Sequence, residues 1–321
     1  MSTRKSMFIE GANFYKGNVH GHTVISDGEL QVEESIEAYK SRGYSFIVIS
    51  DHETYFDSTA YDTENFIVHP GIEWAIEEPK DGHKGHHIHG ILGTKEMVDA
   101  AGDKRIPHGT YLDKYDWKTP QTIQRAIDTL RDAGNLVMYN HPIWSRLELD
   151  DLLNVHGYFA LEIYNWNCEV WDATGVATHY WDMLLRRGLK VYGIASDDNH
   201  NNFPFGSASS DSFGGWIVVA AKKLDRESIA EALVQGSFYA SNGPEIHEYV
   251  HDGDEVHIKC SPVKRINFIT YERRGTTKLA EDGEYITEAT FKLAGDEIFA
   301  RLECVDEFGK TAWSNPLFLQ S

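Results

Sequence analysis

The chain has 321 residues, of which 41% are hydrophobic and 25% charged, as in a typical soluble globular protein. Its formal net charge of −20 repels long polyanions, which argues against a role on long nucleic acids. The three cysteines form no closely spaced pair, so neither a thiolate zinc site nor a disulfide framework is indicated. Cys260 and Cys304 could pair if they face each other, but the favoured interpretation is that both are buried small apolar residues. The first ten residues have no apolar stretch and no run is long enough to span a membrane, which predicts a cytoplasmic protein without membrane partners.

Strands and helices alternate along the first three quarters of the chain. Short β-branched runs indicate buried strands, and apolar residues at helical spacing indicate helices between them. In chain order the pattern predicts strand 17–19, helix 29–42, strand 44–50, a strand ending at 92, helix 119–133, strands 136–139 and 159–163, a helix through 181–185, strands 190–195 and 216–220, and a helix through 229–233. This alternation predicts parallel strands with right-handed crossovers. The number of repeats favours a closed barrel, with an open sheet as the alternative.

The pattern changes near Ser241, after which turns and strand-like runs follow one another without a helix. Strands are predicted at 256–260, 266–271, 290–293 and 298–305. In the last of these, alternate residues are apolar, which is typical of a strand with one buried face. The chain is therefore expected to divide into an α/β domain at 1–243 and a small antiparallel β-sandwich at 244–321.

Histidines and acidic residues follow several of the predicted strands. His20 and His22 are two residues apart in an extended segment, so their side chains point the same way and can meet at one ion. The other candidate ligands are Asp27, His52, Glu73, His89, His141, Asp198 and His200. Taken singly, each has an ordinary explanation: a chance His-x-His, a His-Pro turn or an Asp at a helix N-cap. Their recurrence at strand ends predicts a shared multi-metal site, and imidazole with carboxylate but no thiolate suits Zn²⁺, Mn²⁺ or Fe²⁺.

The order of these motifs resembles that of the PHP (polymerase and histidinol phosphatase) family. The motifs are Asn18-Val-His-Gly-His-Thr, Ser26-Asp-Gly, Ser50-Asp-His, Gly71-Ile-Glu, His89, His141-Pro and Asp198-x-His200, and they run from about residue 16 to 205. The resemblance implies a distorted, TIM-like (β/α)7 barrel with two or three divalent metals at the carboxyl ends of its strands. The tail, Gly236-Ser-Phe-Tyr-Ala-Ser-Asn-Gly-Pro-Glu and Ala312-Trp-Ser-Asn-Pro, is similar to the carbaryl-hydrolase-like branch, whose members often append a β-domain.

The resemblance also implies how the ligands divide. His20, His22, Glu73 and Asp198 would hold one ion, and Glu73 would bridge to a second ion held by His89 and His141. Asp27, His52 and His200 would hold a third. Some relatives have histidine where this chain has Asp27, which leaves the third ion open. His87 is the alternative to His89, and Asp197 the alternative to Asp198, although the Asp-x-His spacing favours Asp198.

These ligands predict a metal-dependent phosphoesterase (a phosphoric ester hydrolase) that acts on a small phosphomonoester or nucleotide. A metal-bridging hydroxide would attack the phosphorus atom. We assign catalytic roles to His52, Asp198 and Arg146, with His52 or a bound water as the proton donor to the leaving group. Lys84, Arg146 and Trp144 are predicted to bind the substrate, and for the two basic residues a solvated surface charge is the alternative.

Two other functions remain open on the sequence alone. The same ligands would serve a carbamate, ester or amide hydrolase, because a tetrahedral oxyanion needs similar cationic support. Basic side chains converging on the site would favour phosphate, and an apolar pocket would favour the other bonds. A non-catalytic, metal-stabilised binding protein is the remaining alternative, and it predicts no turnover of any ester.

Overall fold

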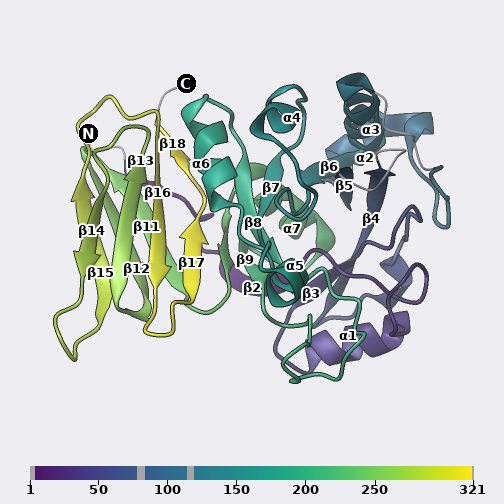
Figure 1. Cartoon of the computed structure of the whole chain (residues 1–321), viewed down its shortest axis with the longest axis horizontal. Coiled ribbons are helices and arrows are strands. Elements are labelled where there is room, and N and C mark those ends of the chain that lie inside the picture. Colours follow the sequence, from purple (N-terminus) through teal and green to yellow (C-terminus); the bar gives the residue numbers. More distant parts are fainter. Residues whose placement is uncertain (1–3, 78–83, 114–118, 320–321) are drawn as a thin grey trace.

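The computed structural model describes residues 4–77, 84–113 and 119–319. Figure 1 shows two regions side by side: one of mixed helices and strands, and one built from the green and yellow C-terminal strands. In the described residues, no helix is long and apolar enough to cross a membrane.

The first region alternates strands and helices. Its strands are β2 (Asn13–Asn18), β3 (Phe46–Ile49), β4 (Ile67–Glu77), β5 (Gly85–Leu92), β6 (Asn135–Tyr139), β7 (Ala160–Asn165), β8 (Tyr192–Ser196), β9 (Trp216–Ala221) and β10 (Phe238–Ser241). Its helices are α1 (Val32–Lys40), α2 (Lys95–Ala101), α3 (Pro120–Asp132), α4 (Leu149–Leu153), α5 (Trp166–Asp172), α6 (Thr178–Arg186) and α7 (Arg226–Gln235), with short 3-10 turns η1 (Thr59–Tyr61) and η2 (Gly102–Lys104). The predicted strands and helices of this region are confirmed to within a few residues at each end.

Helix α3 shows how the sequence specifies these elements. Pro120 opens the helix, where its missing N–H costs nothing, and Gly134 follows its end with a φ of 89° that favours glycine. Ile123, Ile127 and Leu130 lie on one face and are buried in the main core beside β5 and β6. The apolar spacing of 3 and 4 residues therefore fixes which face of the helix meets the sheet.

The expectation that the strands are parallel throughout is wrong. The strand order is β10-β9-β2-β3-β4-β5-β6-β7-β8, and β2–β3, β3–β4, β6–β7 and β7–β8 are parallel. Strand β5 is antiparallel to both β4 and β6, and β9 is antiparallel to β2 and β10. Only residues 78–84 separate β4 from β5, whereas a parallel crossover needs a dozen residues or more.

The described strands form a mixed parallel and antiparallel sheet, and their hydrogen-bonded ladders do not close into a barrel. Strand β8 at one end of the order contacts β9 and β10, but in residues 4–77, 84–113 and 119–319 no hydrogen-bonded ladder joins them. The closed (β/α)7 barrel therefore stays a prediction.

The second region consists of strands and turns. Its strands are β11 (Ile246–Asp252), β12 (Glu255–Val263), β13 (Arg265–Thr270), β14 (Thr276–Leu279), β15 (Ile286–Lys292), β16 (Phe299–Val305), β17 (Thr311–Ser314) and β18 (Leu317–Phe318). β11, β12 and β15 form a separate sheet, which β1 (Lys5–Ser6) completes from the N-terminus. The remaining strands continue the large sheet, because β17 pairs with β10.

The two sheets of this region enclose one apolar core. Phe268 of β13 stacks on Phe291 of β15 with ring centroids 4.9 Å apart, and Ile258 and Leu302 are buried between the sheets. Cys304 is buried in the same core. The predicted division at 243/244 stays a prediction, and the pairs β1–β11 and β10–β17 are hydrogen-bonded ladders across it.

Candidate metal centre

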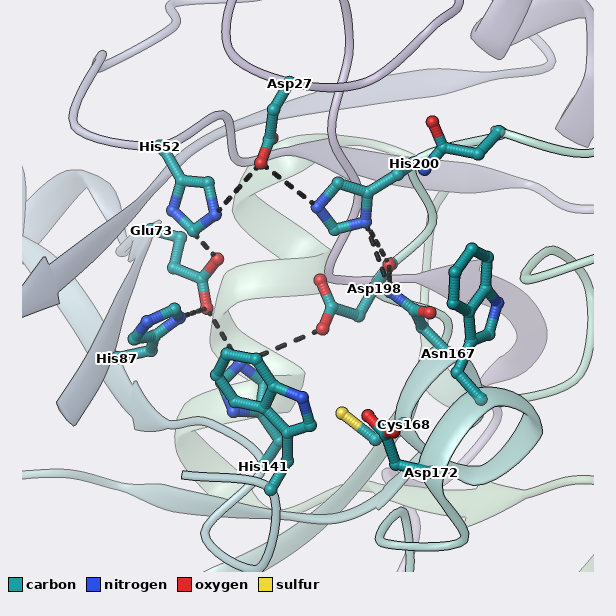
Figure 2. A pocket seen from close by; sticks show the side chains of 13 residues that line it. Asp27, His52, Glu73, His87, His141, Asn167, Cys168, Asp172, Asp198 and His200 are labelled. Atoms are coloured by element: carbon teal, nitrogen blue, oxygen red, sulfur yellow. Dashed lines mark hydrogen bonds and ion pairs between the residues drawn. The ribbon is translucent and has the colours of Figure 1, made fainter. Parts of the chain in front are cut away.

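Three overlapping groups of imidazoles and carboxylates lie at one end of the α/β region. In each group, one potential ligand atom per residue lies within 4.8 Å of all the others. The groups are His20, His22, Glu73 and Asp198; His22, Asp27, His52 and His200; and His52, Glu73 and His87. Shared members join them into one cluster, most of which Figure 2 shows.

The first group is fully buried. The Nε2 atoms of His20 and His22 both lie 3.2 Å from Glu73 Oε2, and they lie 3.1 and 3.0 Å from Asp198 Oδ1. The two Nε2 atoms are themselves only 3.2 Å apart. Two ring nitrogens and two carboxylates that converge this closely have the composition and spacing of a ligand set for a divalent cation.

The second group lies at the mouth of the cluster. Asp27 Oδ2 is 3.7 Å from His52 Nε2 and 3.5 Å from His200 Nε2, and His22 Nδ1 is 3.6 Å from Asp27 Oδ1. Figure 2 shows the Asp27 carboxylate facing both His52 and His200. The loops after β2, β3 and β8 thus bring Asp27, His52 and His200 together. This is the position at which the resemblance left the third ion open.

In the third group, a ring nitrogen of His87 lies within ion-pair distance of Glu73. His87 Nδ1 lies 3.1 Å and His141 Nε2 lies 3.3 Å from Glu73 Oε1. His89 and His141 are both absent from the three groups, and His89 Nδ1 lies 3.3 Å from Asn140 Nδ2. Both histidines share one face of β5, and for that reason the sequence leaves the choice open. The geometry places His87 with Glu73 and His141, and places His89 beside the His20 ring, 4.9 Å away.

The carboxylates and imidazoles shift each other's pKa values. Burial opposes protonation of His22, but Asp198 and Glu73 outweigh it and raise the pKa to about 10. Burial likewise opposes protonation of His87, and Glu73 and Glu77 raise the pKa to about 9. Burial lowers the pKa of His52 to about 3, so this ring is neutral. A cation that replaces these protons would satisfy the same carboxylates.

Behind the cluster lies Glu162, which sequence reasoning missed. This fully buried carboxylate lies 3.0 Å from His20 Nδ1 and accepts hydrogen bonds of 2.8 Å from the backbone N–H of His141 and 3.0 Å from Asn165 Nδ2. By accepting a hydrogen bond from the Nδ1–H group, it directs the Nε2 of His20 toward the cluster. The available signal was a lone acidic residue within the apolar strand β7.

Two further aspartates hold the loops rather than face the cavity. Asp51 accepts hydrogen bonds from the backbone and hydroxyl of Thr23, both 2.8 Å, and so shapes the loop that carries Asp27. Asp197 accepts from the Tyr39 hydroxyl at 2.7 Å and from the backbone N–H groups of residues 213–215 at 2.7 to 2.8 Å. Asp198 points into the cluster with a left-handed φ of 56°, a strained conformation that is often found at functional sites.

The cluster opens into a cavity of about 280 Å³. Its lining includes Trp144, one of the three predicted substrate-binding residues. The other two lie elsewhere: Lys84 forms an ion pair of 2.6 Å with Asp151, and Arg146 is exposed outside the lining. Among the described lining residues there is no lysine or arginine, so the structure does not bring the predicted phosphate clamps to the site.

Comparison with known proteins supports the fold. A two-domain protein from Bacteroides vulgatus, described as containing a predicted PHP-like metal-dependent phosphoesterase, matches 98% of this chain and 89% of its own with a TM-score of 0.50 and 14% identity. The predicted resemblance to PHP-like proteins is confirmed at the level of the fold. No protein-family profile and no curated protein matches the chain.

Two other solved structures are less similar. An amidohydrolase from Chromobacterium violaceum matches 57% of this chain and 87% of its own, with a TM-score of 0.38 and 15% identity. A candidate metal-dependent phosphoesterase from Bifidobacterium adolescentis matches 68% of this chain and 96% of its own, with a TM-score of 0.39 and 14% identity.

Proposed function

We propose that the protein is a metal-dependent hydrolase of small esters, with phosphomonoesters as the first substrate class. The observation that carries the proposal is the shared position of Glu73, which belongs to two of the three ligand groups on the floor of an open cavity. Clustered divalent cations activate water near neutral pH and stabilise negative charge on the attacking and leaving oxygens.

The residues present fit two or three such cations. His20, His22, Glu73 and Asp198 would hold the first. His87 and His141, opposite Glu73, would hold the second. The third would lie among Asp27, His52 and His200. Imidazole and carboxylate donors suit Zn²⁺, Mn²⁺ or Fe²⁺.

Two other cavity residues do not extend this ligand set. Cys168 lines the cavity, but burial raises the pKa of its thiol well above the ordinary value, so it remains protonated and is a poor ligand. The lowered pKa of His52 keeps this ring neutral, which favours its role as a ligand over that of proton donor.

A carbamate, carboxylic ester or amide hydrolase is the second candidate. It is favoured by one observation: no basic side chain from the described residues lines the cavity. The negative charge of a phosphate group there would be neutralised by the cations alone, whereas a neutral ester or carbamate carries no charge to neutralise.

A substrate panel tests the proposal. The purified protein is loaded with Mn²⁺ or Zn²⁺ and assayed with p-nitrophenyl phosphate, p-nitrophenyl acetate and a p-nitrophenyl carbamate. Turnover of the phosphate that disappears in His20→Ala supports the first candidate, and turnover of only the acyl compounds supports the second. No metal-dependent turnover of any of the three would overturn the proposal and favour the non-catalytic alternative.

A further inference from the structure

The cavity has two chemically different walls. One wall consists of the imidazoles and carboxylates of the metal centre. The other is formed by α5 and nearby loops, and its lining residues are Trp144, Asn167, Cys168, Trp171, Asp172 and Asn202. Asn167 supports the metal centre, because its Nδ2 donates to the backbone oxygen of Asp198 at 3.0 Å and lies 3.2 Å from His200 Nδ1. Bond cleavage gives the two tryptophans no such task, so they bear on what the substrate carries beyond the reacting group.

In the described residues, the exposed tryptophans both lie on this wall. Among the tryptophans in the described part of the chain, only Trp144 (41%) and Trp171 (49%) are exposed, and both line the cavity. Trp74 and Trp181 are buried in the core, as expected for large apolar side chains. Leaving two indole rings in water forgoes the free energy of burying them, so their shared location points to an aromatic contact with a ligand.

The two rings have different neighbours. The Trp144 ring lies edge-on to the His141 ring at 4.9 Å and to the His87 ring at 5.5 Å, next to the reacting end of the cavity. Trp171 lies near the end of α5 and contacts the half-exposed Phe203 ring at 5.1 Å. One indole ring therefore stands beside the metal centre, and a second stands on α5.

The polar groups of the wall limit the charge of the ligand. Asp172 contributes a carboxylate and Asn202 an amide, and no lysine or arginine from the described residues lines the cavity with them. A second phosphate or a carboxylate in this position would be repelled by Asp172 without a compensating cation. A neutral or cationic group would not be repelled.

From these observations, and resting on the proposed function, we infer that the substrates are esters whose leaving group carries a neutral or cationic aromatic ring. The ester group faces the metal centre, and the ring packs against Trp144 and Trp171. The cavity volume of about 280 Å³ lies just below the usual range of small-molecule sites, which begins at about 300 Å³, and so suits a single ring system.

The first test compares benzyl phosphate with ethyl phosphate, whose leaving groups are both simple alkoxides. The metal-loaded enzyme is expected to prefer the benzyl ester by about three- to tenfold in kcat/KM, the range of one aromatic contact. The preference should disappear in Trp171→Ala and survive in Trp171→Phe. Phe308→Ala, which removes a ring that is 81% exposed and outside the cavity, is the matched control and should keep the preference.

A binding measurement separates this inference from the proposed function. Calorimetry with benzylphosphonate and ethylphosphonate should show tighter binding of the benzyl compound, dependent on Trp171. Equal binding of the two, or no binding of either, overturns the inference even if both phosphate esters are hydrolysed. If neither ester is hydrolysed but the Trp171-dependent preference in binding remains, the phosphoesterase function fails and the aromatic subsite stands.

Discussion

The two regions of this molecule use histidine and acidic residues in opposite ways. In the α/β region, His20 and Glu73 are buried and directed at one another. In the all-strand region, His247 and Glu245 also approach, to 3.8 Å, but both side chains are more than half exposed and solvent screens the pair. The comparison shows that residue type alone does not mark a functional site. Only the buried and converging groups are energetically unfavourable unless a ligand such as a metal ion pairs with them.

The largest expected difference between the regions concerns metal. His20→Ala should remove the first ion and lower kcat/KM by more than about a hundredfold, since losing even an outer partner of a ligand costs ten- to a hundredfold. The exposed His247→Ala is the control in the other region and should change neither quantity. Metal content by elemental analysis and activity are measured together, and a fully metallated, active His20→Ala would refute the ligand assignment.

The buried Glu162 extends the comparison beyond the ligands. Glu162→Gln keeps the shape but loses the charge opposite His20 Nδ1, so metal affinity should fall by roughly ten- to a hundredfold. Glu288→Gln, on the exposed face of β15, should leave the affinity unchanged. Competition with a metal-binding dye gives both values; equal affinities for the two variants would show that Glu162 does not position His20.

Proton release is a further consequence of the convergent site. Without metal, the raised pKa values of His22, about 10, and His87, about 9, keep both rings protonated at pH 7. A cation must displace these protons, so affinity should rise with pH between about 6 and 9, by roughly tenfold per unit for each proton released. Calorimetry in buffers of different ionisation enthalpy measures the release; binding without proton release would contradict the account.

The smallest effect on the site is expected from the core of the all-strand region. Leu302→Ala creates a cavity between the two sheets and should lower the free energy of unfolding by about 2 to 5 kcal/mol, while the folded protein keeps its metal. Leu279→Ala, at a side chain that is 68% exposed, should stay within about 0.5 kcal/mol of the original protein. Denaturant unfolding together with metal analysis checks both, and metal loss from folded Leu302→Ala would show that the sandwich supports the site.

Local patterns in the sequence were sufficient to predict most elements. The apolar run at 44–50 predicts β3, which is buried throughout. The apolar spacing at 119–133 predicts α3, which is buried on one face. Strand direction was not predictable in the same way: β5 is buried on both faces, and its composition is the same whether it runs parallel or antiparallel.

The sequence predicted which types of residue form the site better than it predicted how those residues are arranged in space. The motifs pointed to the histidines and carboxylates, but His87 and His89 share one strand face, and only the position of Glu73 distinguishes them. A lone acidic residue in an apolar strand marks Glu162, but its partner His20 lies far away in sequence, and no local pattern reveals that the two are in contact. Lys84 pairs instead with Asp151, which no spacing rule indicates.

Counting bound metal is the most direct test of the central claim. The purified protein is stripped with a chelator, titrated with Mn²⁺ or Zn²⁺ and analysed for metal per chain. The account predicts two or three tightly bound ions, with fewer in His20→Ala and the full number in His247→Ala. Less than one ion per chain in the folded protein would contradict it.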